Sequence, residues 1–256
     1  MPSQIYIRGL SVPGPIPSEN YIARLPVVRH LQDRGGLTFH RPVTFLVGEN
    51  GVGKSTLIEA IALCSGFNAE GGTINFTFST RASHSDLYRY LRLVRNAQRN
   101  LDGFFLRAES FYNVATNVDQ LDEGPSMGLR RLIDSYGGRS LHQQSHGESF
   151  LSLVEHRFSG HGLYILNEPE AALSPMKLMT LMVLMQELVS HQSQFIISTH
   201  SPILMTFPGA EIYALSEQGI RSVGYRETEH FQITRRFLDA PDRMLDLLGL
   251  TGSDET

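Results

Sequence analysis

The chain has 256 residues, an ordinary globular composition, a formal net charge of -4 and a single cysteine, Cys64. One cysteine excludes a disulfide framework within the chain and fits a reducing compartment, while the negative net charge argues against a protein that coats nucleic acid. The N-terminus lacks the pattern of a signal peptide, and no segment has the ~18 consecutive apolar residues of a membrane-spanning helix. We therefore expect one cytoplasmic domain over residues 1–256.

The first elements predict a small antiparallel sheet. Residues Ser3–Val12 alternate apolar and polar side chains, as a strand with one buried face does, and the prolines from Pro13 to Pro17 end the pattern. Residues Tyr21–Val28 suit a second strand. An N-terminal antiparallel sheet ahead of the next strand fits both segments.

The strongest motif begins with the buried-strand pattern Val43–Val47. Residues Gly48–Ser55 follow at once and match G-x-x-x-x-G-K-[ST], and an apolar helix pattern starts at Leu57. Strand, glycine loop and helix in this order are the context of a phosphate-binding loop. The alternative is a chance glycine-rich turn.

The residue types of this loop explain its chemistry. Its glycines let the backbone curl so that successive N–H groups point at one anion, and the following helix adds its positive end. We expect Lys54 to reach the β- and γ-phosphates and the Ser55 hydroxyl to bind Mg²⁺. The predicted nucleotide-binding residues here are Gly48, Glu49, Asn50, Gly51, Val52, Gly53, Lys54, Ser55 and Thr56.

A strand over Gly71–Ser79 and a helix over Ser85–Leu101 are expected next. On that helix Arg92, Arg95 and Arg99 would share one face. Such a face could contact a nucleic-acid backbone or an acidic partner, or it could simply be solvated.

Three further segments precede the next buried strand. Phe104–Ala108 reads as a short strand that leads into Glu109, and a polar, glycine-rich stretch then holds one short helix near Met127–Tyr136. The small residues of Ser145–Ser149 open an apolar-periodic helix. The N-terminus of that helix could bind an anion or be an ordinary capped end.

The continuous apolar run Leu163–Leu166 predicts a fully buried strand, and Asn167 and Glu168 follow it. Four apolar residues before two acids would match the second ATPase motif, in which the acids contact magnesium and act as general base. Here an amide replaces the first acid. Pro175 then opens a helix over Met176–Val189.

The last strands and helices complete the predicted sheet. Gln194–Thr199 is a buried strand, and His200 stands at its carboxyl end, where ligands collect in open α/β sheets. The remaining predicted elements are a hairpin of Glu211–Leu215 and Gly219–Tyr225 and helices over Phe231–Leu238 and Pro241–Leu248.

The order of these motifs resembles the ATP-binding-cassette (ABC) ATPase fold, and within it the small soluble ATPases grouped with DNA-repair, chromosome-maintenance and overcoming-lysogenisation-defect enzymes. The resemblance implies an α/β P-loop NTPase head with a mostly parallel central sheet, an N-terminal antiparallel sheet and a helical lobe at about residues 80–160. Only about 90 residues separate Lys54 from Ser145, so the head carries no long coiled-coil arms. The motifs that carry the resemblance are Gly48–Ser55, the turn around Glu109, Ser145–Ser149, Leu163–Glu168 with Ala172–Ser174, and His200.

The resemblance also implies a role for each matching residue. Glu168 would orient the attacking water, His200 would contact the γ-phosphate, and Lys54 would complete the catalytic set. Ser145 and Gly147 match the signature turn that caps the γ-phosphate bound by the opposite subunit. The implied assembly is a head-to-tail homodimer that encloses two ATP molecules.

The implied metal site contains Ser55, Asn167 and Glu109, the last in the region where the family has a glutamine. Because Asn167 brings no negative charge, magnesium would be held more weakly and turnover could be slow. Three functions stay open: an Mg²⁺-dependent ATPase in DNA maintenance or defence, a nucleotide-gated scaffold with little turnover, and the motor subunit of a transporter. We also expect a further protein partner, which the sequence does not identify.

Overall fold

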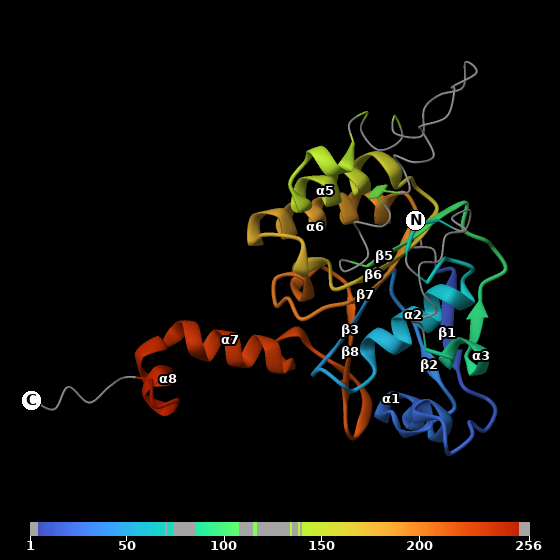
Figure 1. Cartoon of the computed structure of the whole chain (residues 1–256), viewed down its shortest axis with the longest axis horizontal. Coiled ribbons are helices and arrows are strands. Elements are labelled where there is room, and N and C mark those ends of the chain that lie inside the picture. The colour runs from blue at the N-terminus through green and yellow to red at the C-terminus, as the bar shows by residue number, and fades with distance from the viewer. Residues whose placement is uncertain are drawn as a thin grey trace, which may run out of the picture.

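The computed structural model describes residues 5–69, 71–73, 85–107, 115–116, 134, 138 and 140–250. Its centre is a six-stranded sheet in the order β5-β6-β7-β3-β8-β9, in which only β9 runs antiparallel to its neighbour (Figure 1). These strands are β3 (Val43–Gly48), β5 (Asp102–Arg107), β6 (Gly162–Asn167), β7 (Gln194–Ser198), β8 (Glu211–Ser216) and β9 (Gly219–Val223).

Helices cover both faces of this sheet. The helix α2 lies on one face and the helices α5 and α6 lie on the other (Figure 1). Strand residues alternate between the two layers, so Phe45 packs in the core with α5 and α6 while Leu46 packs with α2. The α-helices are α1 (Pro26–Asp33), α2 (Lys54–Cys64), α3 (Leu87–Tyr90), α5 (His146–Arg157), α6 (Pro175–Ser190), α7 (Glu229–Asp239) and α8 (Pro241–Leu247).

A second, three-stranded sheet has the order β2-β1-β4, with both pairings antiparallel. It consists of β1 (Ile7–Ser11), β2 (Leu37–Thr38) and β4 (Arg92–Arg95). The predicted fold class, a mostly parallel α/β sheet with an N-terminal antiparallel sheet, is therefore confirmed. The prediction of a strand over Tyr21–Val28 is wrong, because Pro26 begins α1 at the position where a helix tolerates proline.

The predicted helix over Ser85–Leu101 is also wrong. The structure has the short helix α3 followed by β4, whose backbone pairs with β1. Leu91 is buried, as the predicted helix would place it, but Leu101 is 83% exposed. The conformation of residues 92–95 was decided by pairing with β1 and not by local periodicity. Arg92 and Arg95 therefore lie on a strand, with Arg99 beyond its end, and they do not form a helical stripe.

Some predictions fall outside the described residues. Glu109 lies there, and so do most of the predicted helix near Met127–Tyr136 and most of the predicted strand over Gly71–Ser79. The single-domain division, with a helical lobe at about residues 80–160, stays a prediction. Across the described parts of the chain, no helix is both long enough and apolar enough to cross a membrane.

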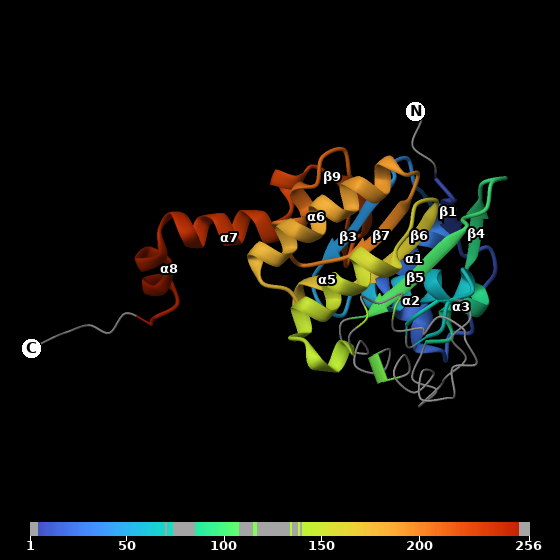
Figure 2. The same cartoon turned by 90° about the horizontal axis from the view of Figure 1, so that it is seen from above.

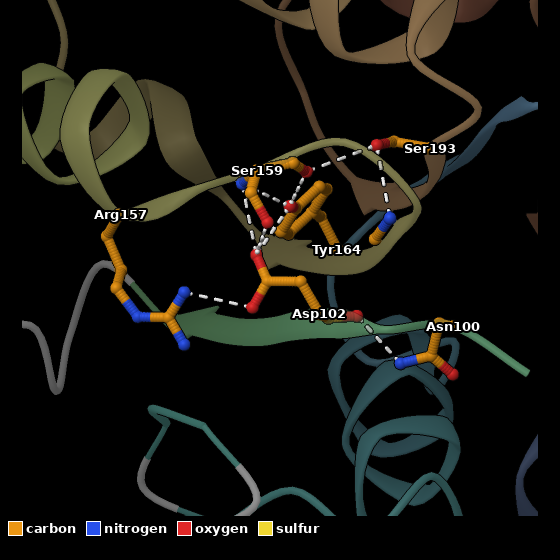
Figure 3. A network of polar contacts seen from close by, with 7 residues as sticks. Asn100, Asp102, Arg157, Ser159, Tyr164 and Ser193 are labelled. Carbon is orange, nitrogen blue, oxygen red and sulfur yellow. Dashed lines mark hydrogen bonds and ion pairs between the residues drawn. The ribbon is translucent and has the colours of Figure 1, made fainter.

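A polar network at the amino end of the sheet connects α5 to the strands (Figure 3). The Asp102 carboxylate accepts from Arg157 Nη1 at 2.9 Å, from Tyr164 Oη at 2.8 Å and from the Ser159 N–H at 3.1 Å. Ser193 Oγ extends it by accepting from the Gly162 N–H at 3.2 Å. Because Arg157 is the last residue of α5, the network attaches that helix to the first residue of β5.

The C-terminal helices α7 and α8 project from the rest of the molecule as an arm (Figures 1 and 2). Neither helix contains a buried residue. Several large apolar side chains on the arm are exposed, among them Leu238 at 71% and Leu247 at 74%. The arm therefore contributes little to the hydrophobic cores on the two faces of the sheet.

Candidate nucleotide site

The loop between β3 and α2 has the backbone that its glycines predict. Gly48, Gly51 and Gly53 all adopt positive φ, at 143°, 88° and 99°, which side-chain-bearing residues rarely do. A Cβ at Gly48 would collide with the Leu215 carbonyl oxygen, and one at Gly53 would lie 2.6 Å from Val27 Cγ1. A cavity of about 130 Å³ opens beside the loop, lined by Leu25, Asn50, Gly51, Gly53, Lys54, Ser55 and Thr56.

Lys54 is the first residue of α2 and is only 4% exposed. Its ammonium donates to the carbonyl oxygens of Gly48 at 2.6 Å and Glu49 at 2.7 Å. Burial lowers the pKa of Lys54, while the carboxylates of Glu168, Glu170 and Glu49 act in the opposite direction. The cation is therefore held at the loop, where it would meet an anion bound by the backbone N–H groups.

Glu168 and His200 lie at the carboxyl ends of neighbouring strands. Glu168 follows β6, has a φ of 52°, and donates its N–H to the Ser198 carbonyl oxygen at 2.9 Å. Its Oε1 lies 3.7 Å from His200 Nε2. Because β7 pairs with both β6 and β3, these two side chains lie at the same sheet edge as the phosphate loop.

The environment of His200 keeps its imidazole neutral. Burial lowers the pKa of His200 to about 4, and the nearby Lys54 and His230 add to this effect. The pKa of His230 is also lowered, first by burial and then by Lys54. Both rings are therefore uncharged near pH 7, and each has one donor and one acceptor nitrogen.

Two residues at this site were missed by the sequence reasoning. Glu170 accepts from Thr199 Oγ1 at 2.8 Å and from the His200 N–H, and burial raises the pKa of Glu170. Its place in the segment Asn167–Glu170 was a usable signal. His230 Nε2 lies 2.8 Å from His200 Nδ1, and no sequence pattern pointed to this contact.

Asn167 fits a magnesium site of modest strength. Its side chain is 4% exposed, and its Oδ1 has no hydrogen-bond partner among the described residues. No group of three or more His, Cys, Asp or Glu side chains suited to a metal occurs in the described residues either. Mg²⁺ commonly keeps several waters and binds through substrate phosphates with few protein ligands, and the Ser55 hydroxyl and Asn167 Oδ1 are chemically suited to complete such a shell.

The signature turn is a well-formed helix start. Ser145 caps α5, and Glu148 Oε2 accepts from the Ser145 N–H at 3.0 Å and from its Oγ at 2.6 Å. Lys177 Nζ donates to Ser145 Oγ at 3.3 Å, and a Cβ at Gly147 would lie 2.8 Å from Lys177 Cδ. The contacts of Ser145 and Gly147 join α5 to α6 and the residues before it, and α5 and α2 lie on opposite faces of the sheet.

Residues 28–117 match a family model described as an AAA domain, which covers less than half of the chain and includes the phosphate loop. No curated protein matches the chain. Known structures resemble it at low identity, and the TM-scores below are too low to support a functional conclusion.

One similar structure is MJ1267, an ATP-binding cassette of an ABC transporter, with 12% identity, a TM-score of 0.47 and coverage of 95% of this chain and 99% of that one. Another is cbiO1 from Clostridium perfringens, part of the ABC transporter complex cbiONQ, with 18% identity, a TM-score of 0.44 and coverage of 84% and 90%. A third is the SMC head domain from Thermotoga maritima, with 19% identity, a TM-score of 0.40 and coverage of 74% and 92%. The family match over residues 28–117 and the geometry of the loop Gly48–Ser55 agree with the expected phosphate-binding loop.

Proposed function

We propose that the chain binds ATP with Mg²⁺, hydrolyses it slowly and pairs head to tail with a second copy when ATP is bound. The observation that carries this proposal is the convergence of three side chains at one sheet edge. Lys54 is held at the phosphate loop, and Glu168 lies 3.7 Å from His200 on the neighbouring strand ends. A cation, a carboxylate and a neutral imidazole are the groups that phosphoryl transfer to water uses.

In this mechanism the loop N–H groups and Lys54 bind the β- and γ-phosphates. Glu168 orients the attacking water, and the His200 Nε2–H donates to a γ-phosphate oxygen. Ser55, Asn167 and Glu109 would hold Mg²⁺, which would supply positive charge to the leaving phosphates. The weak point is Asn167, since an amide contributes no charge to the metal site.

The test of this function is the steady-state turnover of ATP with Mg²⁺, comparing the chain with its Asn167→Asp variant. The aspartate should bind magnesium more tightly and raise turnover roughly 10-fold or more, because a carboxylate adds a full charge beside the metal. ATP affinity measured without Mg²⁺ is the control and should change little. A variant no faster than the parent would exclude Asn167 as the group that limits the rate.

A nucleotide-gated scaffold is the second candidate, and the uncharged amide of Asn167, which stands where an acid is expected, favours it. In that case ATP would hold two chains together without useful hydrolysis. Parent and Asn167→Asp variant would both be inactive but would still dimerise with ATP. The third candidate function is the motor subunit of a transporter. Co-purification of the chain with a membrane protein would support this function.

The separation of the signature turn from the phosphate loop supports pairing between chains. A Ser145→Arg variant should bind ATP with unchanged affinity but lose ATP-induced dimerisation, because the long side chain would fill the space for the opposite γ-phosphate. Light scattering with and without ATP measures the dimer. An ATP-dependent dimer of normal stability in this variant would exclude the trans-capping role.

The setting in DNA maintenance or defence rests on the resemblance of the motifs alone. Nucleic-acid binding through Arg92, Arg95 and Arg99 stays a prediction, now without the helical face that first suggested it. Arg95 also donates to the Cys64 carbonyl oxygen at 2.7 Å, which gives that side chain a structural contact.

A further inference from the structure

His230 reaches the nucleotide site from outside the strands that build it. It belongs to the first turn of α7, which Thr228 caps by accepting from the Phe231 N–H at 3.4 Å. Thr228 is only 2% exposed, so this turn is anchored although the rest of α7 is not buried. His230 also lines a cavity of about 610 Å³ together with the phosphate-loop residues Gly48 and Glu49.

The contact between the two histidines has a defined geometry. His230 Nε2 lies 2.8 Å from His200 Nδ1, and the ring planes are inclined by 63° with centroids 5.0 Å apart. Two neutral imidazoles that face each other nitrogen to nitrogen share one proton, so one ring donates and the other accepts. The tautomer of His200 is therefore tied to that of His230.

The other nitrogen of His200 indicates which ring donates. His200 Nε2 faces the Glu168 carboxylate at 3.7 Å, and an oxygen acceptor favours N–H rather than a lone pair at that position. If Nε2 carries the proton of a neutral His200, Nδ1 must accept. His230 Nε2–H is then the donor, and the N–H of His200 points toward Glu168 and the phosphate site.

We propose that His230 is a positioning residue that holds the His200 ring in the tautomer whose Nε2–H points into the nucleotide site. The inference rests on the proposed function, because this N–H is the one that would donate to a γ-phosphate oxygen. Since α7 leaves the body of the molecule after this turn, the same contact links the nucleotide site to the α7–α8 arm.

The first test compares two substitutions of His230. A His230→Phe variant keeps an aromatic ring but has no donor. Its kcat for ATP should fall roughly 10- to 100-fold with little change in KM, which is the usual size of the loss when a side chain that orients a functional histidine is removed. A His230→Gln variant, whose amide N–H can donate to His200 Nδ1, should recover most of this loss. His40→Phe is the matched control, since His40 is exposed and precedes the amino end of β3.

Two results would overturn the proposal. Turnover by the phenylalanine variant at the parental rate would show that the donor is dispensable, and a glutamine variant as slow as the phenylalanine variant would show that donation is not what matters. Thermal unfolding of each variant identifies any loss caused by misfolding. If the phenylalanine variant does not fold, His230→Ala removes the donor without placing a ring in the space.

The second test reads the tautomer directly and does not need turnover. In ¹⁵N NMR spectra near pH 7, with His200 assigned from a His200→Gln variant, His200 should show protonated Nε2 and unprotonated Nδ1. In His230→Phe the signal should shift toward a mixture of tautomers. An inactive parent chain would contradict the proposed ATPase function but leave this measurement valid, whereas a His200 signal unchanged by His230→Phe would contradict the positioning role.

Discussion

The two ends of the parallel sheet satisfy their polar groups to different degrees. At the amino end, both oxygens of Asp102 accept hydrogen bonds, and the Tyr164 hydroxyl both donates and accepts (Figure 3). Among the described residues, Asn167 Oδ1 and Ser198 Oγ are buried without a partner at the carboxyl end, and His161 Nδ1 is such an atom directly before β6 at the amino end. Because buried polar atoms are normally paired, the two unpaired oxygens at the carboxyl end fit the proposed ligand site, while the Asp102 network makes the amino end a structural support.

The same strand, β6, contributes to both ends. Tyr164 stacks on Phe158 with ring centroids 4.1 Å apart and joins the Asp102 network, while Asn167 ends the strand at the nucleotide site. A stable frame at one end supports exact placement of side chains at the other. Substitutions at the carboxyl end should therefore reduce function without reducing stability. Substitutions at the amino end should reduce stability without reducing function.

The largest functional effect is expected from Lys54→Ala. Removing the ammonium eliminates the only cation in the described loop Gly48–Ser55, and ATP affinity should fall at least about 100-fold, as expected when a charged partner of a phosphate is lost. Filter binding or calorimetry measures this change, and thermal unfolding should show a folded protein. Unchanged ATP affinity would refute the assignment of the phosphate loop.

Glu168→Gln should separate binding from chemistry. The amide keeps the size of the side chain but cannot act as a base, so turnover should fall roughly 100-fold or more while ATP stays bound. Single-turnover kinetics together with ATP affinity distinguish the two steps. If the variant hydrolysed ATP at the parental rate, another group would have to orient the water.

Asp102→Asn should affect stability and leave the nucleotide site largely intact. It removes the charge partner of Arg157, whose Nη1 lies 2.9 Å from Asp102 in a poorly exposed pair, and breaking such a pair costs about 3 kcal/mol in the free energy of unfolding. Chemical denaturation measures the loss. ATP affinity of the folded variant is the control, and a large drop in affinity would contradict the separation of the two ends.

The stability that Asp102 contributes should depend on pH. Burial alone would raise the pKa of Asp102, but Arg157, Tyr164 and Ser159 outweigh it and hold the pKa below its ordinary value. A carboxyl with a lowered folded-state pKa contributes its full stability above the unfolded pKa of about 3.9, and this is lost as the pH falls through the folded value. The stability difference between parent and Asp102→Asn should therefore shrink in acid, and a constant difference from pH 7 to pH 2 would exclude this origin.

Motifs made of consecutive residues were predictable from the sequence, because the backbone conformation of each depends mainly on its own residues. The loop Gly48–Ser55 and the helix after it follow from glycine conformations and apolar spacing, and the buried strands β6 and β7 follow from continuous apolar runs. These segments specified the α/β class and placed Glu168 and His200 directly after buried strands.

Local pattern failed where contacts between distant segments decide the conformation. Leu87, Leu91 and Val94 have a helical spacing, but residues 92–95 form β4, because the backbone of β1 offers them hydrogen bonds. Pro26 and its neighbours form α1 rather than a strand.

The sequence by itself determined that this protein has a phosphate loop, a strand-end carboxylate and a strand-end histidine, since each is encoded within a few consecutive residues. Only the tertiary structure decided what surrounds them. The contact of His230 with His200 joins positions 30 residues apart, and the Arg157–Asp102 pair joins positions 55 apart. Side-chain contacts over such separations depend on how helices pack on the sheet, and no local pattern specifies that packing.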